Sequence, residues 1–199
     1  MPNVRAAGGT AVTEPKVTLA TPTDLAEAEP VMREILAHDL GGYRRRWHAD
    51  IDDLARSYLR TPGCALLVAR AADGEGARTA GDVLGTAAVR PCRLASPPNP
   101  AWIVREYNRP EVCQLVRVWV SRTARRRGAG RALVEKAVAW SVGPGGYSRV
   151  YLHTDAGVPG AEDFWRSLPV REVLDCRPDP FNCVHFEIDV PVVLRATRC

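Results

Sequence analysis

The stretch that decides the fold of this chain is Val118–Trp140, VWVSRTARRRGAGRALVEKAVAW. It begins as a strand, because Val116, Val118 and Val120 alternate with Arg117 and Trp119 at a period of two. It ends as a helix, because apolar and small residues recur at the spacing of one buried helical face: Gly130, Leu133, Val134, Ala137, Val138 and Ser141. The sequence therefore predicts a strand, a turn and an amphipathic helix in direct succession.

The turn between them, Arg125–Gly130, has a composition that suits an anion. Three arginines at the positive end of a helix dipole are each disfavoured by roughly 0.3–1 kcal/mol when exposed. Two glycines in a first turn cost about 0.5–1 kcal/mol each relative to alanine. A bound anion offsets both, since glycine lets backbone N–H groups approach it and arginine neutralises it. The alternative is a solvated run of arginines, because every basic residue except Lys16 and Lys136 is arginine.

The spacing within the turn narrows the kind of anion site. There is no G-K-[ST] sequence and no G-x-G-x-x-G sequence in an early βαβ unit, so neither a P-loop nor a dinucleotide-binding turn is indicated. Instead Arg125, Gly128 and Gly130 form R-x-x-G-x-G, with Val-x-Val at 118–120 before it and Leu133 after it. This motif resembles motif A of the GCN5-related N-acetyltransferase (GNAT) family, whose loop cradles the pyrophosphate of acetyl-CoA.

Two downstream segments extend the resemblance in the order that the family shows. RVYLHTD at Arg149–Asp155 is similar to the family's following strand, and AEDFWRSL at Ala161–Leu168 is similar to its A-x-x-F-Y helix. The resemblance implies an α/β fold with a mixed central sheet of about seven strands and about four flanking helices. It also implies that the central strand carries a bulge and splays from the next one, so that its backbone pairs with the pantetheine arm.

The chain is interpreted as one domain at residues 16–191, between a disordered leader at 1–15 and a C-terminal tail at 192–199. Strands are predicted at Val17–Ala20, Cys64–Arg70, Val83–Val89, Val112–Val120, Arg149–Thr154, Val170–Cys176 and Val184–Val190. Helices are predicted from the Thr21 cap to Leu40 and at Asp50–Leu59, Trp102–Tyr107 and Ala161–Leu168. A further helix is the one already predicted to follow the Arg125–Gly130 turn. Gly-rich Ala72–Asp82 is predicted to be a turn and Pro-rich Pro91–Pro100 a loop.

Composition excludes several function classes. The formal net charge of +4 comes from 27 basic and 23 acidic residues that interleave, which argues against a nucleic-acid partner. No apolar run reaches membrane-spanning length and no N-terminal apolar segment indicates secretion, so a cytoplasmic protein is expected. The cysteines lack C-x-x-C pairs and nearby histidines at ligand spacing, so free thiols and no metal are expected: Cys64, Cys92, Cys113, Cys176, Cys183 and Cys199.

If the resemblance holds, the cofactor is acetyl-CoA and the reaction is acetyl transfer to an amine. The expected acetyl-CoA contacts are Val118, Trp119, Val120, Arg125, Arg126, Arg127, Gly128, Ala129, Gly130, Arg131, Phe164 and Trp165. Backbone N–H groups at 118–120 are the expected oxyanion donors. The first two helices and the loop between them would line the acceptor pocket, which makes candidate substrate contacts of Trp47, His48, Asp50 and Asp53.

The usual acid and base of the family are missing. Where many relatives have a glutamate on the central strand this chain has Gln114, and where they have a tyrosine it has Trp165. Neither side chain exchanges a proton near neutral pH. His153 and Asp155 are the candidate catalytic residues, with Glu111 and His48 as further options. Two functions stay open, an N-acetyltransferase and a non-catalytic acyl-CoA-binding module; the acceptor is undetermined and a homodimer is possible.

Overall fold

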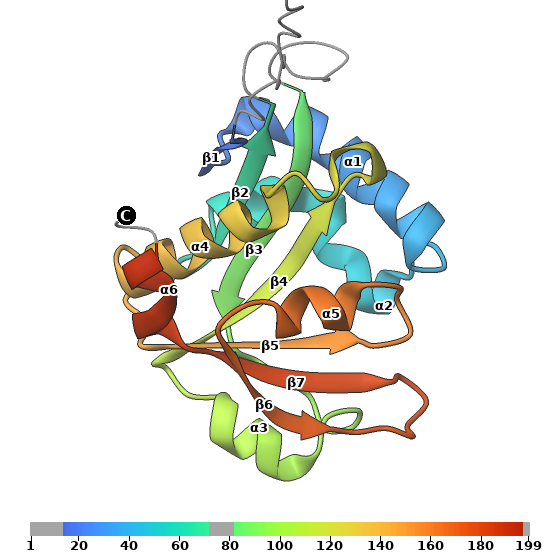
Figure 1. Ribbon diagram of the computed structural model, residues 1–199, viewed down its shortest axis with the longest axis vertical. Coiled ribbons are helices and arrows are strands. Elements are labelled where there is room, and N and C mark those ends of the chain that lie inside the picture. The colour runs from blue at the N-terminus through green and yellow to red at the C-terminus, as the bar shows by residue number, and fades with distance from the viewer. Residues whose placement is uncertain (1–13, 72–81, 197–199) are drawn as a thin grey trace, which may run out of the picture.

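The computed structural model describes residues 14–71 and 82–196. Its strands form one mixed seven-stranded sheet in the order β1-β2-β3-β4-β5-β7-β6 (Figure 1). Every neighbouring pair is antiparallel except β4 and β5, which run parallel. The predicted α/β class and mixed sheet are confirmed. The leader predicted for residues 1–15 and the turn predicted for Ala72–Asp82 lie almost wholly outside the described residues.

The strands are β1 (Lys16–Leu19), β2 (Ala65–Arg70), β3 (Val83–Pro91), β4 (Val112–Val120), β5 (Arg149–Asp155), β6 (Val170–Asp175) and β7 (Cys183–Ile188). The α-helices are α1 (Pro22–Asp39), α2 (Arg45–His48), α3 (Ala101–Tyr107), α4 (Ala129–Val142), α5 (Ala161–Arg166) and α6 (Val190–Ala196). The described residues also contain three short irregular helices: η1 (Ala49–Asp53), η2 (Ala55–Leu59) and η3 (Arg122–Ala124). None of the helices in the described ranges is both long and apolar enough to cross a bilayer.

Helices cover both faces of the sheet (Figure 1). On one face α4, α5 and α6 bury the largest core, in which Leu133 and Val138 of α4 meet β-strand residues such as Leu115. On the other face α1, η1 and η2 pack on β2 to β4, and Met32 and Ile51 are fully buried there. The helical face of α4 predicted from the sequence is the buried one.

The central strand β4 contains a bulge at Arg117. Its register against β3 shifts between Ala88, which pairs with Val116, and Thr86, which pairs with Trp119. Arg117 has φ +56°, a left-handed conformation that is uncommon for a residue with a side chain. Because the bulge inserts one residue, the alternation of side chains changes face at this point. The prediction that Val116 shares a face with Val118 and Val120 was therefore wrong.

The packing of the side chains around the bulge shows the change of face directly. Val118 and Val120 pack with Leu115 in the core beneath α4. Val116 instead packs with Trp119 in the core beneath α1 and η1. A period-two pattern read from sequence assumes an unbroken strand, and one extra residue is enough to invert it.

β4 and β5 separate shortly before the bulge. Their parallel pairing covers only Val112 to Gln114 against Arg149 to Tyr151. From Leu115 onward, the described residues provide no strand partner for the edge of β4 that faces β5. The splay implied by the family resemblance is thus present in the structure, and it leaves an open strand edge at the centre of the sheet.

A buried ion pair holds the bulge in place. The Arg117 guanidinium donates to Asp50 Oδ1 at 2.6 Å and to Asp50 Oδ2 at 2.9 Å, and also to the Trp47 carbonyl. The Tyr58 hydroxyl donates to the same carboxylate. Burial alone would raise the pKa of Asp50, but the Arg117 hydrogen bonds and charge outweigh it and hold that pKa below its ordinary value. The bulge of β4 is thereby tied to η1 and η2.

Gly85 on β3 makes room for the strand segment after the bulge. A Cβ at this position would lie 2.4 Å from the Trp119 carbonyl oxygen and 3.1 Å from Val120 Cα. Both are backbone atoms, which cannot move aside as a flexible side chain can. The glycine therefore permits β4 to pass close to β3 where its register has shifted.

Two predicted elements differ from the structure. The helix predicted at Asp50–Leu59 is instead the 3-10 helix η1 followed by the single π-helical turn η2, with the short helix α2 before them, although Ile51, Leu54 and Tyr58 are buried. The carboxylate of Asp50 points to Arg117 instead of solvent. The tail predicted at 192–199 is helical through Ala196, and Val193 of α6 is buried in the main core. The packed unit therefore extends past residue 191.

We expect Asp50→Asn to lower the free energy of unfolding by roughly 3 kcal/mol, because it leaves the Arg117 charge buried and unpaired. Asp53→Asn is the matched control: Asp53 lies 3.4 Å from Arg60, the two side chains are 50% and 66% exposed, and such pairs contribute about 1 kcal/mol or less. Urea unfolding of both variants measures the difference. Equal losses would contradict a structural role for the Asp50 pair.

The same pair makes a prediction for acid. Since the native pKa of Asp50 lies below its unfolded value of about 3.9, its contribution is present above that value and is lost as pH falls through the native pKa. The stability gap between the wild type and Asp50→Asn should accordingly narrow in acid. A gap that stays constant would show that the Asp50 charge is not what stabilises the bulge.

Candidate functional site

The turn between β4 and α4 lies at the end of the splayed strand (Figure 1). Arg126 has φ +62° and Gly128 has φ +83°, and α4 begins at Ala129 directly after this left-handed pair of conformations. No side chain caps the helix. The N–H groups of its first turn consequently have no internal partner and are available to an anion, as predicted.

The two glycines of the turn serve different purposes. Nothing lies within 4 Å of the position that a Cβ would take on Gly128, so this residue supplies the positive φ and leaves open space in front of the helix. At Gly130 a Cβ would come within 3.1 Å of the Phe164 ring. Gly130 therefore lets the aromatic side chain of α5 pack against the turn, and Phe164 borders the predicted acetyl-CoA site.

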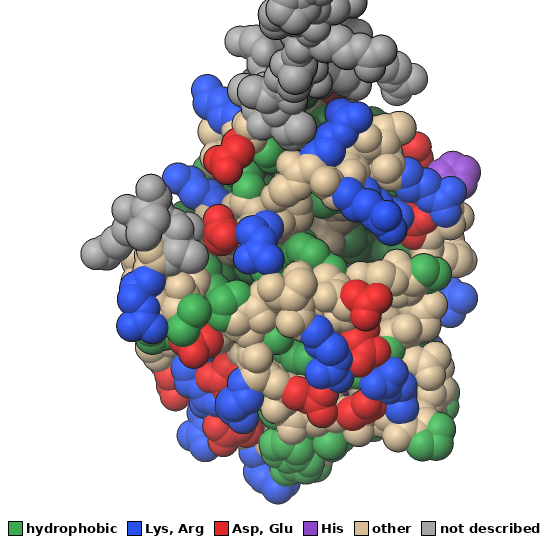
Figure 2. Space-filling model, viewed as in Figure 1, with side chains coloured by type: hydrophobic (Ala, Val, Ile, Leu, Met, Phe, Trp, Pro, Cys, Tyr) green, Lys and Arg blue, Asp and Glu red, His purple; other side chains and the backbone are tan. Residues whose placement is uncertain are grey.

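The arginines of the turn are not equivalent. Arg125 donates to the Val120 carbonyl and forms an ion pair with Asp39 at the end of α1, and Arg122 pairs with the same carboxylate at 2.7 Å. Arg126 and Arg127 are exposed and form no ion pair within the described ranges. Figure 2 shows basic side chains gathered over this part of the molecule, beside a hollow. Arg126 and Arg127 are thus the cations open to a ligand, and Arg125 is already engaged.

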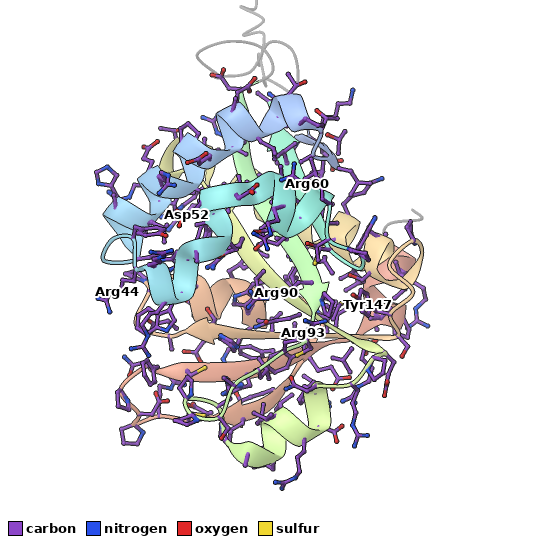
Figure 3. The ribbon with its side chains drawn as sticks, turned by 180° about the vertical axis from the view of Figure 1, so that it is seen from behind. Arg44, Asp52, Arg60, Arg90, Arg93 and Tyr147 are labelled. Atoms are coloured by element: carbon purple, nitrogen blue, oxygen red, sulfur yellow. The ribbon has the colours of Figure 1, made fainter. Side chains whose placement is uncertain are left out.

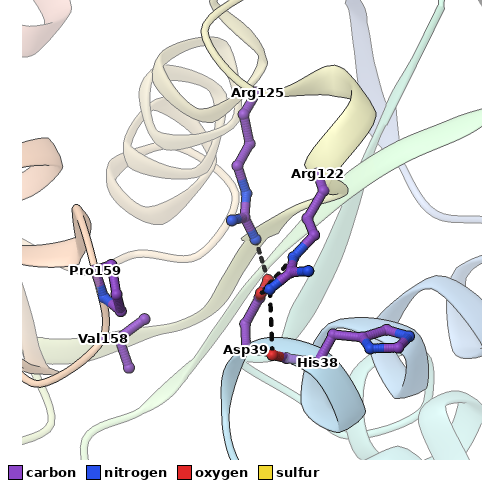
Figure 4. Close-up of a pocket in the computed structure, with 6 residues that line it drawn as sticks. All are labelled: His38, Asp39, Arg122, Arg125, Val158 and Pro159. Carbon is purple, nitrogen blue, oxygen red and sulfur yellow. Dashed lines mark hydrogen bonds and ion pairs between the residues drawn. The ribbon is translucent and has the colours of Figure 1, made fainter.

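A pocket of about 190 Å³ lies beside the turn (Figure 4). Its lining comes from the end of α1, from the β4–α4 turn and from the loop after β5: His38, Asp39, Arg122, Arg125, Val158 and Pro159. Burial would raise the pKa of Asp39, but hydrogen bonds from Arg125 and Arg122 lower it below its ordinary value. Asp39 is therefore a carboxylate that fastens the two arginines and the end of α1 together.

The predicted acceptor contacts lie on the opposite face of the sheet, around α2 and η1. Trp47 is 38% exposed, with Arg46 over its ring at 4.5 Å and Phe181 at its edge. His48 is buried, accepts the Arg44 backbone N–H at 2.9 Å, and has a pKa lowered mainly by burial. Of these two residues Trp47 presents the larger accessible surface, and Asp50 of the predicted set is bound to Arg117.

The remaining member of that set is an exposed carboxylate with a local role. Asp53 accepts the Arg56 backbone N–H at 2.8 Å and lies 3.4 Å from Arg60. Both interactions stabilise the turn from η1 into η2. The structure thus brings Trp47, His48 and Asp50 together around the bulge, and leaves Asp53 at the surface.

His153 on β5 belongs to a chain of polar side chains on this same face. Its Nδ1 lies 3.5 Å from Gln114 Nε2 and 3.3 Å from the Tyr151 hydroxyl. Gln114 Oε1 in turn accepts two hydrogen bonds from Arg90, at 2.9 and 3.1 Å. The predicted catalytic histidine is therefore connected to an arginine through the residue that occupies the family's glutamate position.

The environment of His153 favours a neutral ring. His153 is an exposed residue by its accessible surface, yet the protein groups around the ring exclude water from it, and this desolvation is the largest cause that lowers its pKa to about 4. Repulsion from His185, Arg90 and Arg117 adds to this effect. At neutral pH the imidazole is uncharged and can accept a proton, although it is a weaker base than an ordinary histidine.

The other candidate acids and bases lie elsewhere. Asp155 at the end of β5 is exposed and accepts the Gly157 backbone N–H at 2.8 Å, so it caps the following turn. Glu111 is exposed before the start of β4, at the end of the strand remote from the bulge. Trp165 is buried in the main core beneath α4 and is only 7% exposed. Its main contribution to the structure is therefore side-chain packing.

A cluster of potential metal ligands was missed by the sequence analysis. His153 pairs with His185 across β5 and β7, and ligand atoms of His153, Cys183 and His185 lie within 4.8 Å of one another. The spacing Cys183-x-His185, which places both on one strand face, was the available signal. However, His185 already uses both nitrogens, with the Tyr151 hydroxyl at 2.6 Å and Cys176 Sγ at 3.3 Å. We therefore assign no metal to the cluster.

The thiols fit the prediction of free cysteines. The cysteines within the described ranges are all unpaired: Cys64, Cys92, Cys113, Cys176 and Cys183. Cys199 lies outside those ranges. Burial raises the pKa of Cys92 to about 12 and that of Cys113 to about 11, so both remain protonated and pack as small apolar groups.

Comparisons with solved structures agree with this geometry. An acetyltransferase of the GNAT family from Staphylococcus aureus Mu50 superimposes with a TM-score of 0.63 at 14% identity, over 88% of this chain and 99% of that one. A GCN5-related N-acetyltransferase from Kribbella flavida gives 0.54 at 23% identity, over 87% and 95%. A spermidine N-acetyltransferase from Vibrio cholerae, solved with CoA and spermine, gives 0.60 at 11% identity, over 88% and 95%.

At these identities, the solved structures establish the fold alone. No curated protein sequence matches the chain. A sequence model of the Acetyltransferase (GNAT) family, however, matches residues 31–168, which include the bulged strand, the glycine turn and α5. That match covers well over half of the chain, and the turn, the splayed strands and the mixed seven-stranded sheet are those that the resemblance implied. The chain therefore belongs to the GNAT family of acetyltransferases.

Proposed function

We propose that this protein transfers an acetyl group from acetyl-CoA to an amine. The observation that carries the proposal is the meeting of two features at one point of the fold. An uncapped helix with open space before Gly128 adjoins the free edge of β4. The first suits a diphosphate and the second suits an extended amide-containing arm such as pantetheine.

The residues present fit acetyl-CoA in chemistry and in space. The first-turn N–H groups of α4 would hold the diphosphate, with Arg126 and Arg127 as exposed cations beside it. The backbone of β4 from Leu115 to Val120 would pair with the pantetheine arm as an added strand. Phe164, against Gly130, would border the arm, and Val118, Trp119, Ala129 and Arg131 remain proposed contacts by their position.

Acetyl transfer requires a neutral amine, stabilisation of an oxyanion and an acceptor for the amine's proton. Backbone N–H groups at 118–120 are the proposed oxyanion donors, because the edge of this segment that faces β5 has no strand partner among the described residues. His153, which is neutral at pH 7, is the proposed proton acceptor, directly or through water. Asp155 is the second candidate, although its carboxylate already caps a turn.

A second function is supported by a specific feature. Gln114 cannot take a proton and Trp165 is buried, so the two side chains that most often act as base and acid in the family are replaced. These replacements would suit a module that binds acyl-CoA without transferring the acyl group. Incubation with acetyl-CoA and a panel of amines, read by release of the free CoA thiol, separates the two functions: release that depends on the amine supports the enzyme.

We expect Gly128→Asp to weaken acetyl-CoA binding tenfold or more, which corresponds to about 1.4 kcal/mol, because its carboxylate would face the diphosphate. Gly128→Asn is the matched control, since asparagine has the same size, also tolerates positive φ and carries no charge. Calorimetric titration of both variants with acetyl-CoA measures the difference, and thermal unfolding confirms that both are folded. Equal affinities for the two variants would place the diphosphate elsewhere.

We expect His153→Gln to lower kcat by a factor within the ~10²–10⁴ range of general acid–base residues. Asp155→Asn should lower it far less, since an amide oxygen can still accept the Gly157 N–H. Because the pKa of His153 is lowered to about 4, the ring loses its base form only below that pH. The kcat profile should thus show no inflection near the ordinary imidazole pKa of about 6.5. A nearly unchanged kcat in His153→Gln would remove the residue from the chemistry.

A further inference from the structure

Arg90, at the end of β3, is a half-buried cation that forms no hydrogen bond or ion pair with a carboxylate among the described residues, although its charge acts on Asp50 from a greater distance. Its Nε and Nη2 both donate to Gln114 Oε1, at 3.1 and 2.9 Å, and no other side-chain partner is present for it in those residues. A guanidinium offers five N–H donors in a planar fork, so most of its capacity is unused. Figure 3 shows Arg90 between the helical segment around η1 and the strand β5.

Asp50, the carboxylate on this part of the sheet face, already has hydrogen-bond partners. Asp50 binds Arg117 through both of its oxygens and also accepts the Tyr58 hydroxyl. Other partly buried arginines of this protein contact carboxylates: Arg149 meets Glu187 at 2.9 Å, and Arg70 meets Asp24 at 2.5 Å. Arg90 departs from that pattern. A partly buried cation without a counter-ion is uncommon unless a ligand supplies one.

The surroundings of Arg90 are cationic. The positive charges of Arg90 and Arg117 disfavour protonation of His153, and those of Arg90 and Arg93 favour the thiolate of Cys64. Among the described residues, the carboxylate that hydrogen-bonds one of these arginines is Asp50, and its partner is Arg117. Figure 3 places Arg93 next to Arg90 on the same face. Such a field disfavours an acceptor with several positive charges. It favours an acceptor with a negative group, and it also lowers the pKa of an incoming ammonium, which supplies more of the reactive neutral amine.

The position of Arg90 relative to His153 fixes where that negative group would lie. The two residues flank Gln114, whose Oε1 faces Arg90 and whose Nε2 lies 3.5 Å from His153 Nδ1. A molecule whose amine and carboxylate are only a few bonds apart could contact both sides of this carboxamide at once. A peptide, whose terminal amine and terminal carboxylate lie far apart, could not.

On the basis of the proposed acetyl transfer, we propose that the acceptor is a small amino acid whose carboxylate is bound by Arg90 and whose amine is presented beside His153. In this assignment Arg90 determines acceptor specificity, and Gln114 keeps the guanidinium and the imidazole at a fixed separation. Gln114 then has a positioning role in place of the proton transfer that a glutamate would perform. The likeness to a spermidine N-acetyltransferase would accordingly extend to the fold and not to the acceptor.

The test compares matched acceptors. Initial rates of CoA thiol release are measured with the common L-amino acids, with their carboxamides and with spermidine. The wild type should prefer the acid to the carboxamide in KM, and should use spermidine poorly. In Arg90→Met the acid-to-amide ratio of kcat/KM should fall by about 10- to 100-fold, as expected for a lost charge-assisted pair. If the substitution also disturbs His153, kcat/KM changes by the same factor for the acid and for its carboxamide, so the ratio of the two values is unaffected.

Arg105→Met is the matched control, because Arg105 is an exposed arginine on α3. It should leave the ratio unchanged. An acid-to-amide ratio that is the same in the wild type and in Arg90→Met would overturn the proposal, and so would a preference for spermidine over every amino acid. Either result leaves acetyl transfer itself intact, since thiol release would still depend on an amine.

A second measurement covers the case in which no amine supports turnover. N-acetylated L-amino acids and their carboxamides are titrated calorimetrically into the protein saturated with CoA. Binding of the acid that is lost in Arg90→Met would retain the carboxylate site while refuting the catalytic function. Absence of binding by every acid, with CoA still bound, would refute the carboxylate site.

Discussion

The ion pair between Arg117 and Asp50 is the interaction on which the rest of this structure depends. It fixes a left-handed residue in the middle of the central strand and connects that strand to the helices of the opposite layer. In the same part of the strand β4 loses its pairing with β5, and the exposed edge is where a cofactor arm can lie. A carboxylate that the sequence suggested as a substrate contact thus acts one step earlier, by shaping the strand that would hold the cofactor.

The segments that could be predicted from sequence are those whose signals are local. The motif Arg125, Gly128 and Gly130 predicted the turn after β4, and the helical spacing of apolar residues predicted the inward face of α4. Which residues of β4 lie on which face of the sheet could not be predicted, because a bulge adds one residue to the strand and the residue pattern does not reveal where. The short helices around Asp50 were also missed as such, and the partner of Asp50 lies sixty-seven residues away along the chain, where a local pattern does not reveal it.

The parts of the candidate site that sequence could not reveal are those assembled across strands. Arg90 and Gln114 are paired neighbours on β3 and β4, and His153 reaches them only because β4 and β5 are parallel at Gln114. The contact of His153 with His185 likewise follows from strand register. In each case the residue types were visible in the sequence, but their proximity is a property of the sheet.

The short pairing between β4 and β5 also has a mechanical consequence. Three residue pairs, from Val112–Arg149 to Gln114–Tyr151, join the four-stranded part β1–β4 to the three-stranded part formed by β5, β7 and β6. Hydrogen-bonded ladders on either side are longer, so the seam is the place where the sheet resists bending least. A hinge at this seam would change the width of the gap in which the reactants would meet.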